Sequence, residues 1–292
     1  MQPTPDEPQA RAARTGDSRR PALARQRQAY ILDRVRQDGA VRVADLVDRL
    51  GVSDMTIRRD LGLLHARGLV EKMHGGAAAV EGGALFEPGF RAKSTLMREA
   101  KEAIAEAAAK IVEPGTAIGL SAGTTTYALA ERLVDIPGLT VVTNSIPVAE
   151  VLHQRGRSGQ TVILSGGVRT PSDALVGPLA IAALRSLHLD IVFMGVHGMY
   201  PRGFTTPNLM EAEANRALIE AGRRLVVLAD STKWAVIGIS AIARLDEAET
   251  LITDSGLAPD ACAHLEGVLN LVVVDPASAR SRTHADRRAG AA

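Results

Sequence analysis

Seven short runs rich in β-branched residues recur in the second part of the sequence, and Ala-rich stretches with helical spacing separate them. The runs cover residues 116–120, 139–144, 161–165, 190–195, 224–230, 249–254 and 269–275. Strands that alternate with helices in this way are typical of βαβ units, whose strands pair in parallel. The pattern therefore predicts an open parallel-sheet α/β domain.

Composition excludes several other classes of protein. The 292 residues are 46% hydrophobic and 23% charged, which is ordinary for a globular chain of about two domains. A single cysteine, Cys262, rules out an internal disulfide and fits a reducing compartment. No apolar run approaches the ~18 residues that a membrane helix needs, and the N-terminus lacks a secretory signal. We therefore expect a cytoplasmic protein with no membrane partner.

The sequence divides at a Gly-rich stretch, residues 74–84. We expect disordered tails at 1–20 and 276–292, a small helical domain at 21–78, and the α/β domain at 79–275. Residues 19–80 carry twelve Lys and Arg against seven Asp and Glu, whereas residues 81–275 carry sixteen against twenty-two. A basic block on an acidic body suggests a module that binds a polyanion. A chance surplus of surface arginine would give the same charge.

The basic block has the pattern of a winged helix-turn-helix. Periodicity predicts helices at about 24–37, 43–50 and 54–66, a tight turn at 51–53, and a strand and turn at 69–76 that would form the wing. The apolar side chains with helical spacing in the first two helices are Ile31, Leu32, Val35, Val43, Leu46, Val47 and Leu50. Gly51 suits the end of the second helix.

The third helix has one apolar face and one polar face. Ile57, Leu61 and Leu64 form the buried stripe, and at 100° per residue Met55, Arg59 and Gly62 lie opposite, flanked by Thr56 and Arg58. Such a helix suits the major groove, where Arg can pair with guanine and Met or Thr can contact the thymine methyl. The predicted DNA contacts are Ser53, Met55, Thr56, Arg58, Arg59, Lys72 and His74. A small protein-contact domain with solvated arginines would show the same pattern.

These residues also resemble a known family. Arg27, Ile31 and Val35, followed by Ser53-x2-Thr56-Ile-Arg-Arg-Asp-Leu61, are similar to the signature of the DeoR/GlpR family of bacterial regulators. The run Lys72-x-His-Gly-Gly-Ala77 resembles the end of that family's winged domain. The resemblance implies a transcription factor that binds double-stranded operator DNA, usually as a repressor. Asp60 lies at the edge of the buried stripe, and we interpret it as structural, paired with an Arg or a backbone group.

A candidate anion site follows the first predicted strand. Residues 116–120 run into Ser121-Ala-Gly-Thr-Thr-Thr126 and then a helix, so backbone N–H groups and threonine hydroxyls meet at a helix N-terminus. Lys233, one cation after a buried strand, would suit a phosphate. No Gly-Lys-Ser/Thr follows, so this is not a Walker loop. A simple capped βα turn remains an alternative.

Other polar groups follow other predicted strands, at 144–145, 165–167, 195–198 and 230–233. Ligands of open parallel sheets bind beyond the carboxyl ends of the strands. The groups converge only if these strands are neighbours, which the sequence does not prove, and each could be turn chemistry alone.

The second part of the chain resembles the same family's sensor domain. The matching positions are Phe86, Arg91, 101–105, 123–125, 143–145, 165–167, Phe193, Gly195, 211–216 and 229–233. That sensor is similar to ribose-5-phosphate isomerase and glucosamine-6-phosphate deaminase, and its usual effectors are phosphorylated sugars. The resemblance implies that Gly123, Thr124, Thr125, Thr126 and Lys233 hold the phosphate.

The resemblance places Asn144, Gly166 and Gly167 in the sugar pocket. His197 could be a polar sugar contact or a solvated loop histidine. The sequence departs from many members of the family at Ser121, where they carry Asp, and at Asn215, where they carry Lys. These departures bear on which effector binds.

The alternative function is a sugar-phosphate isomerase or deaminase fused to a DNA-binding module. Such an enzyme needs a carboxylate base near the sugar, whereas residues 195–199 carry none. Glu211 and Glu213 lie in a predicted helix, where we interpret them as surface side chains. We therefore expect no catalytic residues. The seven histidines and one cysteine are scattered, so we expect no metal and no cofactor. Since helix-turn-helix proteins pair half-sites, we expect a homo-oligomer, dimer or tetramer, associated through residues 81–275.

Overall fold

The computed structural model describes residues 19–38, 40–67, 69–73, 75–78 and 89–277. The chain forms two compact units, residues 1–80 and 81–292. Most of the two predicted tails and the predicted contact His74 lie outside the described residues. No helix in the described ranges is long and apolar enough to cross a membrane.

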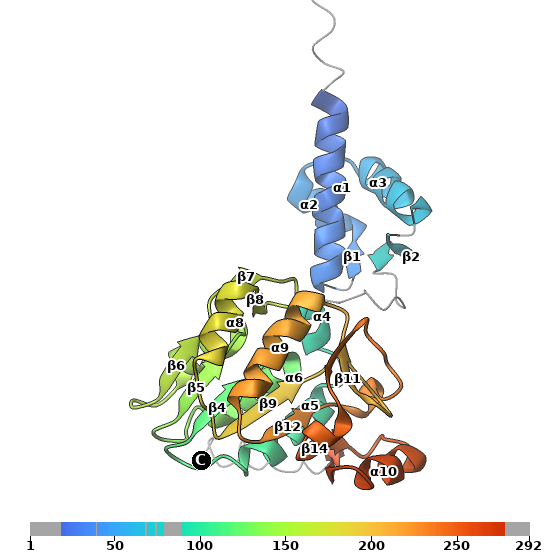
Figure 1. The fold of residues 1–292 in the computed structure, drawn as a ribbon. Helices are drawn as coiled ribbons and strands as arrows, with labels where there is room; N and C mark the ends of the chain where they lie inside the picture. Colours follow the sequence, from blue (N-terminus) through green and yellow to red (C-terminus); the bar gives the residue numbers. More distant parts are fainter. Residues whose placement is uncertain (1–18, 39, 68, 74, 79–88, 278–292) are drawn as a thin grey trace, which may run out of the picture. The chain divides into compact units, whose positions relative to one another are not determined.

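The first unit is a winged helix-turn-helix (Figure 1). Its elements are α1 (Arg19–Asp38), β1 (Ala40–Arg42), α2 (Val43–Leu50), α3 (Asp54–Ala66), β2 (Glu71–Met73) and β3 (Gly76–Ala78). The strands form an antiparallel sheet in the order β1-β3-β2, and β2 and β3 form the wing. Gly51 ends α2 in the left-handed conformation, with φ 63°, as the sequence predicted. The second and third helices have the predicted bounds, whereas the first is longer.

Buried residues of all three helices form the core of this unit, and α3 buries the predicted stripe of Ile57, Leu61 and Leu64. Asp60 is buried beside that stripe and accepts hydrogen bonds from Arg27 Nε at 2.5 Å and Gln28 Nε2 at 2.9 Å. The carboxylate thus ties α3 to α1, which confirms its structural interpretation. A charge buried this way is tolerated because its partners replace the lost water.

Seven parallel strands form the sheet of the second unit within residues 89–277, one from each predicted run. They are β4 (Ala117–Leu120), β5 (Thr140–Thr143), β6 (Thr161–Leu164), β9 (Ile191–Gly195), β12 (Leu225–Leu228), β14 (Thr250–Asp254) and β15 (Asn270–Val274). The helices around them are α4 (Phe90–Ser94), α5 (Arg98–Ala109), α6 (Thr124–Leu133), α7 (Ile146–Arg155), α8 (Pro178–Arg185), α9 (Leu209–Ala221) and α10 (Pro259–Glu266). The predicted α/β class is confirmed.

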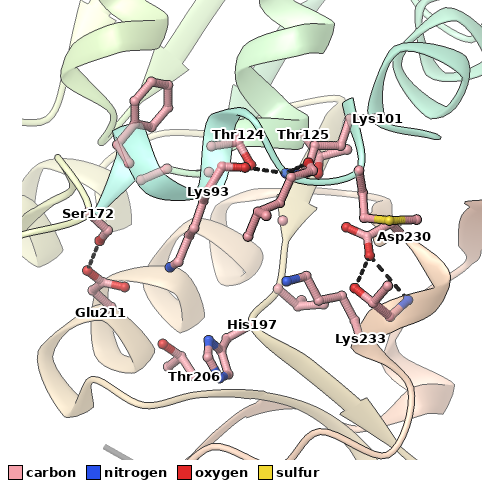
Figure 2. A pocket seen from close by; sticks show the side chains of 18 of the residues that line it. Lys93, Lys101, Thr124, Thr125, Ser172, His197, Thr206, Glu211, Asp230 and Lys233 are labelled. Atoms are coloured by element: carbon pink, nitrogen blue, oxygen red, sulfur yellow. Dashed lines mark hydrogen bonds between the residues drawn. The ribbon is translucent and has the colours of Figure 1, made fainter. Parts of the chain in front are cut away.

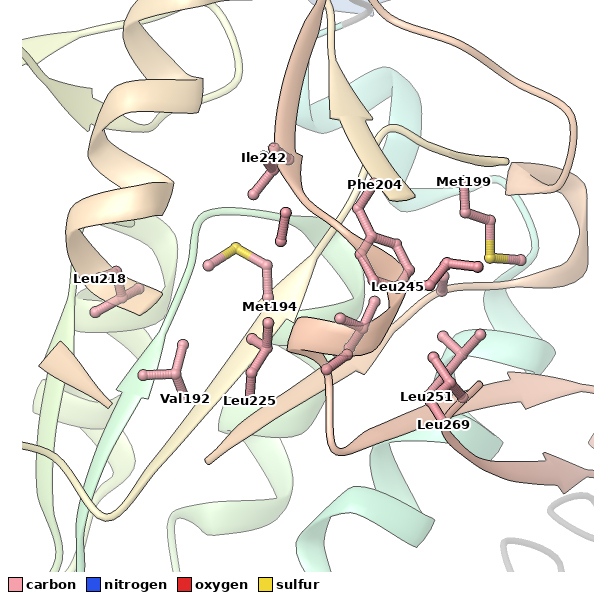
Figure 3. Close-up of a cluster of buried hydrophobic side chains, with 14 of the residues drawn as sticks. Val192, Met194, Met199, Phe204, Leu218, Leu225, Ile242, Leu245, Leu251 and Leu269 are labelled. Carbon is pink, nitrogen blue, oxygen red and sulfur yellow. The ribbon is translucent and has the colours of Figure 1, made fainter. Parts of the chain in front are cut away.

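Two hydrophobic clusters cover the two faces of the sheet. One packs side chains of α5, α6 and α7 against β4, β5 and β9. The other joins α8 and α9 to the opposite face, where Val192, Met194 and Leu225 meet Leu218 and Phe204 (Figure 3). Successive residues of one strand point to opposite faces, so each buried strand contributes to both clusters.

Several short strands were not predicted. They are β7 (Val168–Arg169), β8 (Leu175–Val176), β10 (Gly198–Tyr200), β11 (Gly203–Thr206) and β13 (Ser240–Ala243). The first two form a hairpin, and the other three form a small antiparallel sheet. None of these strands lies in a run of β-branched residues long enough to stand out in the sequence.

The strand order creates a crevice beside β4. The sheet runs β15-β14-β12-β9-β4-β5-β6, so the chain leaves β4 toward β5 and later returns to β4's other side with β9. Connections that depart in opposite directions leave an opening beyond the carboxyl ends of the two strands, where ligands of open α/β sheets bind. The order therefore brings together the loops that follow β4, β9 and β12.

Candidate functional site

The third helix of the first unit presents an exposed polar face. Ser53 caps α3, its Oγ accepting from the N–H of Thr56 at 3.4 Å. Met55 is 80% exposed, and Arg58 and Arg59 are exposed beside it. Arg58 forms an ion pair with Asp54 one turn earlier, with Nε 2.5 Å from Oδ1. The predicted contact residues of α3 thus share one accessible face.

The wing adds a cation to that face. Lys72 is exposed on β2, and a Cβ built on Gly62 would lie 3.5 Å from its Nζ. The ammonium group of Lys72 therefore lies against α3, where a small residue leaves room for it. Together α3 and β2 form a basic surface that suits a phosphate backbone.

A pocket of the second unit lies at the crevice between β4 and β9 (Figure 2). Five of the nine predicted effector contacts line it: Gly123, Thr124, Thr125, His197 and Lys233. They follow β4, β9 and β12, so the strand order brings together groups that the sequence could not place side by side.

The loop after β4 turns directly into α6. Gly123 is the N-cap position of α6, and a Cβ at this position would lie 3.2 Å from Oγ1 of Thr126. Thr126 is buried, and its hydroxyl donates to the carbonyl of Gly123 at 3.0 Å. Thr124 and Thr125 line the pocket, whereas Thr126 does not. Thr126 instead stabilises the loop through its hydrogen bond to Gly123.

The predicted sugar contacts lie elsewhere. Asn144 is 1% exposed; its Oδ1 accepts from the N–H of Ala122 at 2.9 Å, and its Nδ2 donates to the carbonyl of Leu175. Asn144 thus stabilises the loop after β4 through a buried hydrogen bond to its backbone and does not line the pocket. Gly166 and Gly167 follow the edge strand β6, three strands from β9, and do not line the pocket.

Three lysines surround the loop after β4. Lys93 lies on α4, Lys101 on α5 and Lys233 on the short helix η1 (Ser231–Lys233), and all three line the pocket. Lys101 is only 5% exposed, and burial lowers its pKa to about 8. The negative charge of Asp230 raises this pKa, whereas the positive charges of Lys233 and Lys93 lower it further. Burial also lowers the pKa of Lys233. Both ammonium groups would be stabilised by an anion in the pocket.

Two buried carboxylates hold the turn that carries Lys233. Asp254 accepts from the N–H of Ser231 at 2.6 Å and from its hydroxyl at 2.9 Å. Asp230 caps η1, accepting from the N–H of Thr232 at 3.2 Å. The lysine therefore sits on a turn whose backbone is fixed before any ligand arrives.

The wall formed by α9 carries a carboxylate that the sequence analysis placed wrongly. Glu211 is 7% exposed and lines the pocket, whereas Glu213 is exposed as expected. Glu211 accepts a hydrogen bond from Thr170 Oγ1 at 2.6 Å and another from the hydroxyl of Ser172. These donors belong to the segment between β7 and β8, which the sequence did not reveal, so Glu211 looked like a surface residue.

The α9 wall supplies groups suited to a polyhydroxylated ligand. Asn215, one turn after Glu211, lines the pocket, and Thr206 of β11 lines it near His197 (Figure 2). Amide, hydroxyl and carboxylate groups donate to and accept from hydroxyls. Within the described residues, no group of three or more His, Cys, Asp or Glu side chains could hold a metal ion.

Comparison with known families agrees with this geometry. The profile of the DeoR-like helix-turn-helix domain matches residues 27–82, and that of the DeoR C-terminal sensor domain matches residues 97–255. The first profile covers α3 and the wing, and the second covers the pocket except Phe90, Lys93 and Leu96.

Individual relatives match along most of their length. An uncharacterised HTH-type transcriptional regulator, YgbI of Escherichia coli K12, is 38% identical over 80% of this chain and 90% of its own. A putative aga operon transcriptional repressor of Escherichia coli O157:H7 is 32% identical over 83% and 90%. GlpR of Haloferax volcanii is 32% identical over 87% and 98%.

Solved structures give only distant likenesses. A D-ribose-5-phosphate isomerase in complex with phospho-erythronic acid is 16% identical, with a TM-score of 0.36 over 47% of this chain and 54% of that one. The family assignment rests instead on the two domain profiles and the curated relatives. The chain belongs to the DeoR family of transcriptional regulators.

Proposed function

We propose that this regulator is a cytoplasmic repressor of a carbohydrate-metabolism operon, and that a phosphorylated sugar or related metabolite controls its affinity for operator DNA. The observation that carries the proposal is the convergence of Lys233, Lys101 and the Thr124–Thr125 turn in one pocket at the start of α6. The names of two relatives, an aga operon repressor and GlpR, support repression of such operons.

The chemistry of the pocket favours a phosphate monoester. The first N–H groups of a helix have no partner within the helix and carry its positive dipole end, so α6 offers donors to an anion. The hydroxyls of Thr124 and Thr125 and the ammonium of Lys233 add donors from two sides. The sugar would then extend toward Glu211 and Asn215, whose side chains can bond its hydroxyls.

The alternative, an isomerase or deaminase, fits the site less well. A proton-transfer catalyst needs a base near the reacting carbons. Of the pocket's two carboxylates, Asp230 caps η1 and Glu211 receives two hydroxyl hydrogen bonds. The matched relatives are transcriptional regulators. We expect pure protein to turn over no sugar phosphate; measurable turnover that heating abolishes would favour the enzyme.

A thermal-shift screen tests the proposed effector class directly. A ligand at ~100 times its dissociation constant should raise the free energy of unfolding by about 2.7 kcal/mol. Hits are then titrated against operator binding, alongside their dephosphorylated parents. If the dephosphorylated parent sugar changed operator binding as strongly as the phosphorylated ligand, the assignment of a phosphate site would be wrong.

We predict that alanine at Arg59 weakens operator binding by about tenfold, as the loss of one base or phosphate contact does. A base contact would make the loss specific to one base pair. A phosphate contact would weaken all sequences alike and lower the salt slope by about one. Arg58→Ala should act similarly, because Arg58 lies on the same face. Fluorescence anisotropy at several salt concentrations measures both effects.

A matched control for these variants is Arg67→Ala, an exposed arginine at the end of α3 away from its N-terminal half. It should bind operator within about twofold of wild type, since only the first turns of a recognition helix contact bases. Wild-type affinity in both Arg58→Ala and Arg59→Ala would rule out α3 as the recognition helix.

We also predict that the protein binds DNA as a symmetric dimer or tetramer associated through the second unit. One recognition helix reads only a few base pairs, so helix-turn-helix proteins pair half-sites about one DNA turn apart. Sedimentation equilibrium should show no monomer at micromolar concentration. A monomer that binds a single half-site at full affinity would contradict this arrangement.

A further inference from the structure

One wall of the pocket is the segment that follows the boundary between the two units. The α4 segment (residues 89–97) comprises α4 and the turn into α5, and its Phe90, Lys93, Leu96 and Met97 line the pocket. The boundary between the units lies at residues 80 and 81. The α4 segment is thus the first described part of the second unit and also part of its binding site.

Lys101 ties this segment to the pocket. Its buried ammonium donates to the carbonyls of Lys93 and Leu96, both at 2.6 Å. These carbonyls belong to the end of α4 and the turn after it. A cation at the C-terminal end of a helix also meets the negative end of its dipole. Lys101 therefore holds the end of α4 from inside the pocket.

The turn between α4 and α5 has a strained backbone that surrounding contacts must stabilise. Met97 has φ 50° and ψ 37°, a left-handed conformation that is costly for a residue other than glycine. Such a conformation persists only where surrounding contacts fix it. At the other end of the segment, the ring of Phe90 meets Tyr127 of α6 edge to face, with centroids 5.5 Å apart. The segment thus contacts both the helix of the anion loop and the lysine of the pocket.

Charge links the α4 segment to the ligand. Lys93 enters the pocket from the α4 segment, while Lys101 and Lys233 enter from α5 and η1 (Figure 2). Like charges close together repel, and a dianion placed among them removes that repulsion and attracts all three. A bound phosphate therefore favours the arrangement in which Lys93, and with it α4, is drawn into the pocket.

We propose that Lys101 is a positioning residue that couples the effector pocket to the DNA-binding unit through the α4 segment. This inference rests on the proposed phosphate site. A ligand changes affinity elsewhere only by binding two states unequally. Here the two states differ in whether the α4 segment, the first described part of the second unit after the boundary at residues 80 and 81, is docked. Couplings of this kind usually change affinity 5- to 150-fold.

Hydrogen exchange of the full-length wild-type protein tests the first step, with inorganic phosphate as the probe and chloride at matched ionic strength as the control. Phosphate should protect residues 122–126 and 90–97 and leave α10 unchanged. Protection of neither segment would overturn the phosphate site itself. Protection of 122–126 alone would overturn the coupling while leaving the phosphate site standing.

A pair of variants on α5 tests the second step. Lys101→Met keeps the length of the side chain but removes its charge and donors, whereas Lys110→Met changes an exposed lysine at the end of the same helix. DNA affinity is measured on a duplex that the wild-type protein selects from a random library, with and without enough phosphate to protect 122–126 fully.

We expect phosphate to change the DNA affinity of wild type and Lys110→Met by the same factor, within the 5- to 150-fold range. In Lys101→Met this factor should fall below about twofold, and residues 90–97 should lose their protection. A merely structural lysine would alter stability or basal DNA affinity without removing the response. If Lys101→Met keeps the full response, the inference is wrong. If this variant does not fold, the wild-type protein decides the question: phosphate must protect residues 90–97 together with residues 122–126, or the inference is wrong.

Discussion

Alanine at Lys233 is expected to lower affinity for the phosphorylated effector by tenfold to a hundredfold. Lys233 lines the pocket on a turn fixed by Asp230 and Asp254, so its ammonium is held in place before the ligand binds. A hydrogen bond to a charged group contributes roughly 1.5–3 kcal/mol, which corresponds to this range of affinity. Isothermal titration of the purified variant measures the loss.

The pattern across ligands and variants separates a phosphate role from a structural one. Thr125→Val should lower affinity by a smaller factor, because it removes one neutral donor. Lys110→Ala, an exposed lysine outside the pocket, should bind like wild type. The dephosphorylated parent should bind Lys233→Ala and wild type equally weakly. Operator binding without effector should survive; its loss in Lys233→Ala would show that Lys233 supports the fold.

The sequence predicted the framework of this site because strands and helices leave periodic patterns. All seven runs became strands of one sheet, and α2 and α3 have the predicted bounds. The anion loop was visible because a glycine and three threonines directly follow a strand. Such local features need no knowledge of which strands are neighbours.

The remaining parts of the site depend on strand order and on contacts distant in sequence. Asn144 follows β5, next to β4, yet its amide is turned to the backbone of Ala122 and Leu175. Glu211 is buried because the segment between β7 and β8 covers it, and that hairpin is too short to predict. Lys101 has the helical spacing of the buried residues Ile104 and Ala108 of α5, but only the packing shows that this lysine enters the pocket. Residues 166 and 167 resemble family positions but lie beyond the edge strand β6.

Effector affinity should fall as the pH rises above about 8. The pKa of Lys101 is about 8, because burial and its neighbours Lys233 and Lys93 outweigh the attraction of Asp230. A bound dianion favours the ammonium form and raises that pKa, so above pH 8 binding must take up a proton. Affinity then falls by up to about tenfold per pH unit. The second pKa of a phosphate monoester is about 6, so the ligand's own charge stays constant in this window.

Stability without effector should change in the opposite direction. The unfolded chain keeps Lys101 near its ordinary pKa of 10.5, so between about pH 8 and 10.5 the unfolded state holds more protons than the folded one. Stability rises with pH wherever the unfolded state binds more protons, so the penalty that this buried lysine imposes on folding shrinks across that window. Titrations from about pH 7 to 9.5 at constant ionic strength measure the fall in affinity, and denaturant melts over the same range measure the rise in stability. Lys101→Met should reduce both slopes, and Lys233, whose pKa burial also lowers, should supply what remains. Thr125→Val should weaken binding and keep the slope. An affinity that stays constant or rises from pH 8 to 9.5 would show that the buried ammonium does not face the ligand.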